Sequence, residues 1–231
     1  DPPALMARRV KNGTDNISKG PAMSRREALQ AILTGAQIAA EAIENGINLL
    51  ATGEVGIGNT TPSAALISVF TGHSVEAVTG RGTGLKDEAL RHKESIIKKS
   101  IEVNQPDASD PVGVLSKVGG LEIAALTGAI LEAAYRRVPV ILDGIISTAA
   151  ALAAAKLSPH CAEYMISSHN SEEKGHEIGL RQLGINFRLD FHMRLGEGTG
   201  AALMFPMVDA ALKIADEMAT FNAAGVTTGD F

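Results

Sequence analysis

The sequence predicts one three-layer α/β domain, in which helices cover both faces of a doubly wound, mostly parallel sheet of the Rossmann-like kind. Short apolar runs alternate with segments of helical periodicity along the chain, as expected for βαβ units. The segment 138–144 contains a continuous apolar run, which is typical of a strand buried on both faces. No internal repeat or low-complexity linker divides the 231 residues. We therefore expect residues 1–231 to form a single large domain.

The first elements carry clear local signals. Ser24 and Glu27 have capping-box spacing at the start of an Ala-rich helix, and Gly46 is placed to end it. Residues 47–53 follow as a short apolar strand. Pro62 then stands where the first turn of a second helix is expected.

Helices and strands continue to alternate in the rest of the chain. The expected order is helix 86–103, helix 119–137, strand 138–144, helix 146–157, strand 164–170, helix 172–184 and a last helix 198–221 kinked at Pro206. Residues 75–79, just before a glycine-rich loop, are interpreted as a further strand. Ligands of such folds bind at the carboxyl ends of the strands, and the chemically unusual loops of this chain follow the expected strands.

Composition and charge exclude several classes of function. The net charge is −5 without a long basic run, which argues against a dedicated nucleic-acid surface. Cys161 is the single cysteine, so no intrachain disulfide forms and a reducing compartment is expected. The longest apolar stretch, 144–155, is too short to span a membrane, and the start does not resemble a signal peptide. We expect a cytoplasmic protein that binds neither nucleic acid nor membrane.

Residues 53–61 contain three glycines, which permit a ligand to approach the backbone closely. Glu54 among them can accept hydrogen bonds from sugar hydroxyls. A turn that caps the next helix explains this spacing equally well. A dinucleotide fingerprint does not fit, because Thr61 stands where its third glycine is required.

A second glycine-rich loop contains Gly80, Gly82 and Gly84 and leads into a helix, an arrangement that gathers backbone N–H groups around an anion. Lys86 and Lys93 lie on nearly the same face of that helix, and either could add charge to a phosphate site. The loop lacks the ending of a Walker A motif. A lysine on a charged helix is usually just solvated, so the spacing of Lys93 alone carries little weight.

The segment 167–176 contains His169 and His176 with two glutamates between them. Their spacing matches no zincin motif or cysteine-supported site, so we expect no metal. Helix capping combined with polar contacts to a ligand is the better interpretation, and Ser171 belongs to these polar side chains.

In the segment 194–203, Glu197 stands between Gly196 and Gly198 at the start of the last helix. A carboxylate there could simply complement the positive end of the helix dipole. An ionised carboxylate flanked by glycines is also accessible to a flat substrate, as a general base needs to be.

Five segments together carry a resemblance to a known family. They are residues 12–29, 53–61, 80–88, 167–176 and 194–203. In this order they resemble nicotinate-nucleotide–dimethylbenzimidazole phosphoribosyltransferase, a family of lower-ligand assembly in cobalamin biosynthesis. The likeness runs from about Val10 to the last helix.

The resemblance implies a reaction and the residues that perform it. Nicotinate mononucleotide loses nicotinate while 5,6-dimethylbenzimidazole attacks the anomeric carbon with inversion, which gives α-ribazole 5′-phosphate. Glu197 matches the family's general base, and Glu54 matches a residue at the ribose site. The substrate-binding residues that carry over are Glu54, Gly82, Thr83, Gly84, Lys93, Ser171 and Leu195. The resemblance further implies a homodimer that needs no cofactor and no metal.

One departure from the family pattern concerns the start of the chain. Family members carry a substantial segment before the position of Asp1, and that segment helps to form the benzimidazole pocket and part of the dimer contact. A non-catalytic phosphate- or nucleotide-binding module on the same scaffold is therefore an alternative. An NAD-linked or sugar-nucleotide oxidoreductase is a third reading, which the failed dinucleotide fingerprint weakens.

Overall fold

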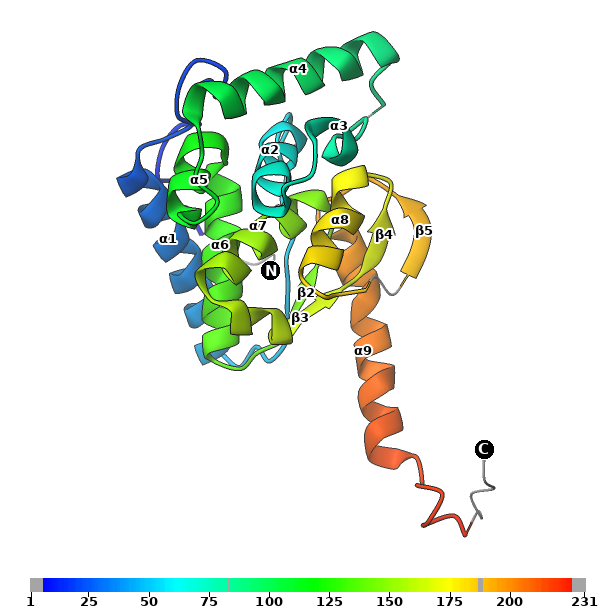
Figure 1. The fold of residues 1–231 in the computed structure, drawn as a ribbon. Coiled ribbons are helices and arrows are strands. Elements are labelled where there is room, and N and C mark those ends of the chain that lie inside the picture. Colours follow the sequence, from blue (N-terminus) through cyan, green and yellow to red (C-terminus); the bar gives the residue numbers. More distant parts are fainter. Residues whose placement is uncertain (1–5, 83, 187–188, 226–231) are drawn as a thin grey trace.

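A computed structural model describes residues 6–82, 84–186 and 189–225 (Figure 1). In these ranges the helices are α1 (Arg25–Glu44), α2 (Thr60–Thr71), α3 (Val75–Val78), α4 (Asp87–Asn104), α5 (Pro111–Val118), α6 (Leu121–Tyr135), α7 (Ile145–Leu157), α8 (Lys174–Gln182), α9 (Thr199–Glu217) and the 3-10 helix η1 (Pro159–Tyr164). The strands are β1 (Leu50–Ala51), β2 (Val140–Leu142), β3 (Met165–Ser167), β4 (His169–Ser171) and β5 (Leu189–Met193). The chain is α/β, as the sequence predicts.

The strands form two parallel sheets. One has the order β1-β2-β3, with Leu50 opposite Val140 and Ile141 opposite Ile166. The other pairs β4 with β5. The expected strand 164–170 is thus divided at Ser168, whose hydroxyl donates to the carbonyl of Leu142 at 2.7 Å. The strands expected at 47–53, 138–144 and 164–170 are present, but each is shorter than expected.

Helices cover both faces of the first sheet. In β2 the side chains of Val140 and Leu142 belong to the main core, to which α1, α2, α5, α6 and α7 also contribute. Ile141 points to the opposite face, where it packs with Ala201 and Met204 of α9. Because successive strand residues alternate between faces, this one strand separates two helical layers. The three-layer α/β architecture is therefore confirmed, as one domain.

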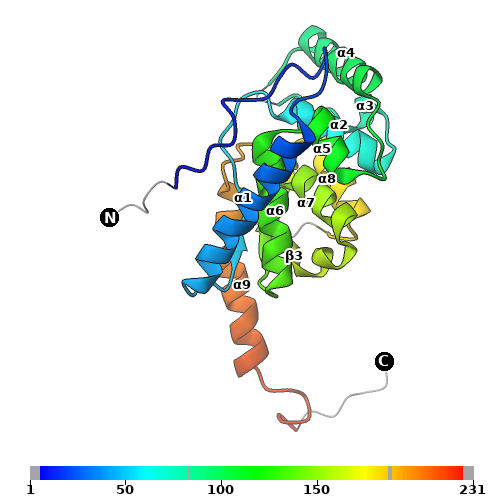
Figure 2. The ribbon, with the colours of Figure 1, turned by 90° about the vertical axis from the view of Figure 1, so that its left-hand side faces the viewer.

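Helices α1 and α6 lie side by side in backbone contact (Figure 2). A Cβ atom on Gly35 would overlap the carbonyl of Ala125, and one on Gly128 would overlap the carbonyl of Ile32. Glycine at both positions therefore lets the helices approach more closely than side chains would allow.

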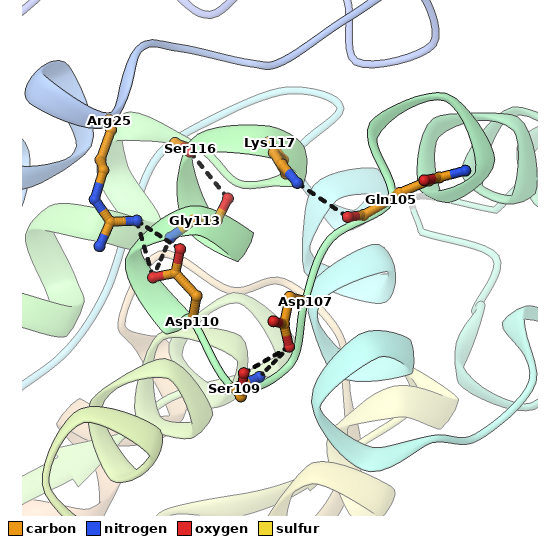
Figure 3. A network of polar contacts seen from close by, with 8 residues as sticks. All are labelled: Arg25, Gln105, Asp107, Ser109, Asp110, Gly113, Ser116 and Lys117. Atoms are coloured by element: carbon orange, nitrogen blue, oxygen red, sulfur yellow. Dashed lines mark hydrogen bonds and ion pairs between the residues drawn. The ribbon is translucent and has the colours of Figure 1, made fainter.

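A polar network fixes the N-terminus of α1 to that of α5 (Figure 3). The guanidinium of Arg25 donates to Asp110 at 2.6 Å, and Asp110 also accepts from the backbone N–H of Gly113 at 3.1 Å. Lys117 at the end of α5 donates to the carbonyl of Gln105. Helix α5 is not among the elements expected from the sequence, although an aspartate followed by proline is a standard helix start.

Some further expectations are wrong. Residues 75–79 form the short helix α3, capped by Ser74, and not a strand. Strand β5 was not expected, because its residues are largely exposed and show no apolar alternation. Helix α9 continues through Pro206 and ends at Glu217, four residues before the expected end. In the part of the chain that the structure describes, no helix has the length and apolarity needed to cross a membrane.

Candidate active site

A pocket of about 520 Å³ lies at the carboxyl ends of β1, β2, β4 and β5. This volume is in the usual range for a small-molecule site. The pocket gathers most of the expected substrate-binding residues: Glu54, Gly82, Lys93, Ser171 and Leu195 all line it. Their loops are far apart in the sequence, and the parallel strands bring them to one edge, as expected.

Two of the expected residues stand apart from this group. Thr83 lies outside the described residues. Gly84 is exposed in a left-handed conformation with φ of 117° and does not line the pocket. Of the two lysines considered, Lys86 is the exposed N-cap of α4, and Lys93 is the one that reaches the pocket.

One end of the pocket, which we call the anion end, carries a buried positive charge. The ammonium of Lys93 is buried and donates to the hydroxyl of Thr60 at 2.9 Å and to the carbonyl of Gly80 at 3.2 Å. Burial lowers the pKa of Lys93, and the negative charge of Glu173 opposes that change. The N-termini of α2 and α7 also border this end, and helix N-termini favour negative charge.

Glu173 is a residue of this end that sequence reasoning did not single out. Its Oε1 accepts from the backbone N–H of Gly82 at 2.6 Å, and the side chain is buried. Gly80 leaves the space for this carboxylate, because a Cβ atom there would overlap Oε2. The sequence shows Glu172 and Glu173 side by side and gives no signal of which one is buried.

The other end of the pocket carries carboxylates. Glu54 is half-buried and accepts a hydrogen bond from the amide of Asn59. Burial raises the pKa of Glu54, and the negative charges of Glu122, Asp143 and Glu197 raise it further, against the effect of the Asn59 hydrogen bond. A Cβ atom on Gly196 would lie 3.6 Å from Glu54 Oε1, so the turn that carries Glu197 passes directly beside Glu54.

Glu197 belongs to a turn of three consecutive left-handed residues. Gly196, Glu197 and Gly198 have φ of 76°, 59° and 75°. Such a conformation is unusual for a residue with a side chain, and it persists where the surroundings enforce it. Glu197 is exposed and does not itself line the pocket, which its turn reaches through Gly196, next to Arg194 and Leu195.

The buried carboxylate of Asp143 enforces this turn. Asp143 directly follows β2 and accepts three backbone hydrogen bonds: from Gly198 at 3.0 Å, from Gly200 at 2.9 Å and from Ala201 at 3.2 Å. It therefore caps the N-terminus of α9, the role that the simpler interpretation gave to Glu197. Asp143 is not among the site residues expected from the sequence, although a carboxylate directly after an apolar strand is a signal that the sequence contains.

The histidines are placed for structural roles. His176 is buried, and its two ring nitrogens contact the hydroxyl of Thr148 and the carbonyl of His169, both at 2.8 Å. The His169 ring lines the pocket, and burial lowers its pKa. Among the described residues, no group of three or more His, Cys, Asp or Glu side chains is placed to hold a metal ion.

Comparisons with known proteins agree with one another. Residues 1–226 match a family model described as phosphoribosyltransferase. Nicotinate-nucleotide–dimethylbenzimidazole phosphoribosyltransferase from Desulforamulus reducens is 53% identical over 97% of this chain, and that from Geobacter sulfurreducens is 52% identical over 100%. The chain spans 64% and 66% of these relatives, a little less than two thirds of their length.

A solved structure shows the same likeness. The crystal structure of CobT from Thermus thermophilus superposes with a TM-score of 0.92 at 43% identity, over 99% of this chain and 68% of that one.

Proposed function

This chain belongs to the phosphoribosyltransferase family, and from that premise we propose that it transfers the phosphoribosyl group of nicotinate mononucleotide to 5,6-dimethylbenzimidazole or a related azole. The products are α-ribazole 5′-phosphate and nicotinate. Family membership confirms the resemblance carried by the five sequence motifs. It gives no support to the oxidoreductase reading, which is not retained.

The observation that carries this proposal is the division of one pocket into two chemically different ends. Lys93, Gly82 and Ser171 line an end suited to a phosphate. Glu54 and the turn of Glu197 lie at an end suited to a sugar and a nitrogen base. A mononucleotide has the same two parts in the same order.

At the anion end, the substrate is held by groups that do not react. The Lys93 ammonium binds the 5′-phosphate, with Ser171 as a further hydrogen-bonding side chain. The N–H groups of Gly82 and Gly84 are donated within the protein, to Glu173 and to the carbonyl of Arg81. Binding energy from such a remote group aligns the anomeric carbon with the incoming azole. We assign Leu195, which is exposed at the pocket edge, to an apolar contact with the substrate.

At the carboxylate end, the bond to nicotinate breaks and its electron pair leaves on the pyridine nitrogen. The lone pair of one azole nitrogen forms the new bond to the anomeric carbon. Positive charge that develops on the ribose is stabilised by the carboxylates of Glu54 and Glu197. Glu197 accepts the proton of the other azole nitrogen as that proton becomes acidic, a contribution of typically about 10²–10⁴-fold.

Product formation tests the proposal. The purified protein is incubated with nicotinate mononucleotide and dimethylbenzimidazole, and α-ribazole 5′-phosphate is measured by mass spectrometry. We expect Glu197→Gln to lower the rate by about 10²-fold or more. Glu163→Gln, which removes an exposed carboxylate of η1, is the matched control and should leave the rate unchanged.

An equal rate for the wild type and Glu197→Gln would refute Glu197 as the base. Tight binding of the mononucleotide without any product would instead favour the non-catalytic nucleotide-binding module.

A homodimer and a cytoplasmic location complete the proposal, with neither metal nor cofactor required. The dimer rests on the resemblance to the family, and the location on the single cysteine, Cys161. Size-exclusion chromatography with light scattering measures the mass of the protein in solution and tests whether it is a dimer. Unchanged product formation after treatment with a chelator tests the absence of a metal requirement.

A further inference from the structure

The Glu173 carboxylate is buried and incompletely paired. The residue is 6% exposed, and its Oε2 has no hydrogen-bond partner among the described residues. Its other oxygen accepts from the backbone N–H of Gly82. A buried carboxylate normally has more partners than this, because desolvation of its charge is costly. Its position at the anion end of the pocket, where a negative charge would ordinarily repel a phosphate, therefore needs a physical reason.

The carboxylate contacts the glycine-rich loop and acts on Lys93 through its charge. It holds the loop at Gly82, and it fills the space that Gly80 leaves open. The carbonyl of Gly80 in turn accepts from the Lys93 ammonium. Glu173, the loop and Lys93 therefore form one connected unit, and a change at Glu173 reaches Lys93 through both charge and loop geometry.

Several charged groups on the elements around Lys93 have partners elsewhere, while the titratable His92 and the charged Arg194 line the same pocket. Arg81 of the loop pairs with Asp87 at the start of α4. Glu76 of α3 pairs with Lys98, and Lys117 of α5 donates to a backbone carbonyl. Helix α2, which contributes Thr60, contains no charged residue. Among the described residues, Glu173 is the group whose negative charge acts on Lys93.

We propose that Glu173 is a positioning residue for phosphate binding: its carboxylate balances the charge of the buried Lys93 ammonium and holds the glycine-rich loop in place through Gly82. This inference rests on the proposed phosphate end of the pocket. Glu173 does not touch the reacting atoms, and it acts through Lys93 and through the loop. Some repulsion of the phosphate by the carboxylate is the cost of a charged lysine at a buried position.

The substitution Glu173→Gln separates the two parts of this role. The amide oxygen can still accept from the N–H of Gly82, so the loop keeps its contact while the negative charge disappears. Burial lowers the pKa of Lys93, and the charge of Glu173 raises it. Without that charge, Lys93 loses its proton at a lower pH. The pH above which phosphate affinity falls should therefore decrease, by about one unit.

The experiment measures binding of inorganic phosphate by titration calorimetry between pH 6 and pH 10. It compares the wild type with Glu173→Gln and with Glu172→Gln, an adjacent and exposed glutamate that pairs with His192. Circular dichroism confirms that each variant folds. We expect the alkaline limit of binding to move for Glu173→Gln and to stay in place for Glu172→Gln. An unmoved limit for Glu173→Gln, or an equal shift in both variants, overturns the inference.

A mutant cycle tests the contact with the loop independently. Gly80→Ala places a methyl group against the Glu173 carboxylate and should weaken phosphate binding about ten-fold. In the Glu173→Ala background the space is vacant, so the same change should cost less than about two-fold. Equal losses in both backgrounds would show that Gly80 and Glu173 act separately. That result would overturn the proposed role of Glu173 in holding the glycine-rich loop.

The outcomes for this inference and for the proposed function are distinguishable. Phosphate binding with the expected shift, but no product from nicotinate mononucleotide, leaves the role of Glu173 standing and removes the proposed reaction. Product formation with an unmoved alkaline limit of phosphate binding supports the proposed reaction and overturns the role of Glu173. A wild-type protein that binds no phosphate overturns the inference.

Discussion

At the scale of single residues, three charged side chains at or next to the pocket are buried. Lys93, Asp143 and Glu173 are each less than 10% exposed, and each is held by backbone groups of another segment. The resemblance to the family identified Lys93, but it could not show this burial. Burial of a side chain depends on residues far away in the sequence, such as Thr60 for Lys93. The spacing of residues along one helix cannot predict such contacts.

His176 makes stability depend on pH. Burial lowers its pKa to about 4 from an ordinary value of 6.5. The unfolded chain therefore binds a proton at a higher pH than the folded protein does. The contribution of His176 is complete above about pH 6.5 and is lost as the pH falls toward 4, by about 3 kcal/mol in total. Urea denaturation at several pH values measures this loss.

The prediction has a matched pair of variants. His176→Gln should remove the part of the pH dependence between pH 6.5 and 4 that His176 contributes, while His169, whose pKa burial also lowers, keeps its own contribution. It should also lower stability at neutral pH, since a well-placed buried ring is lost. His160→Gln, at an exposed position, should leave the profile unchanged. A profile that is the same for the wild type and His176→Gln would contradict the assignment.

At the scale of helices and strands, local signals predicted those elements that have them. Ser24 and Glu27 form the capping box that their spacing predicts, and α1 begins there. Strand β1 is only two residues long, because pairing with β2 and not the apolar run sets its length. Strand β5 has no apolar alternation, since it pairs at the edge of a small sheet with most of its side chains exposed. Sequence periodicity detects neither of these features.

The contact of α1 with α6 gives a prediction at this scale. Gly128→Ala would force a methyl group against the carbonyl of Ile32. Alanine is the better helix former by about 1 kcal/mol, so any loss of stability reports the clash. We expect a net destabilisation of about 2 kcal/mol and a decrease in Tm of about 4–8 °C. Thermal denaturation followed by circular dichroism measures this change.

Gly20→Ala is the control, because nothing lies within 4 Å of the added atom. Its stability should stay within about 0.5 kcal/mol of the wild type. Unchanged or increased stability of Gly128→Ala would mean that the two helices can move apart at little cost.

At the scale of the whole molecule, the pocket depends on the topology of the sheet. Segments that begin at Glu54, Asp143 and Ser171 meet because parallel strands end at one edge. The alternation of strands and helices in the sequence predicts that these segments lie close together. The residues that face inward could not be predicted, since the division of the strand at Ser168 and the left-handed turn at Glu197 decide which side chains reach the pocket.

Helix α9 crosses the face of the first sheet and then extends away from the body of the molecule in both views (Figures 1 and 2). Its first turns pack on Ile141 through Ala201 and Met204, while its later residues are exposed. The turn of Glu197 is therefore attached to the core at the packed end of this helix.

The capping of that turn by Asp143 sets the time scale on which it can move. Its amide hydrogens point into a carboxylate that continues the central strand, so they can meet solvent only when that strand loosens. In deuterium exchange, the amides of Gly198, Gly200 and Ala201 should be replaced far more slowly than that of Asn222 in the exposed turn after α9. Equal labelling rates would show a turn that opens by itself. Slow labelling would mean that ligands bind to a preformed turn. Entry and release of ligands, and not closure of this turn, would then limit the rate of turnover.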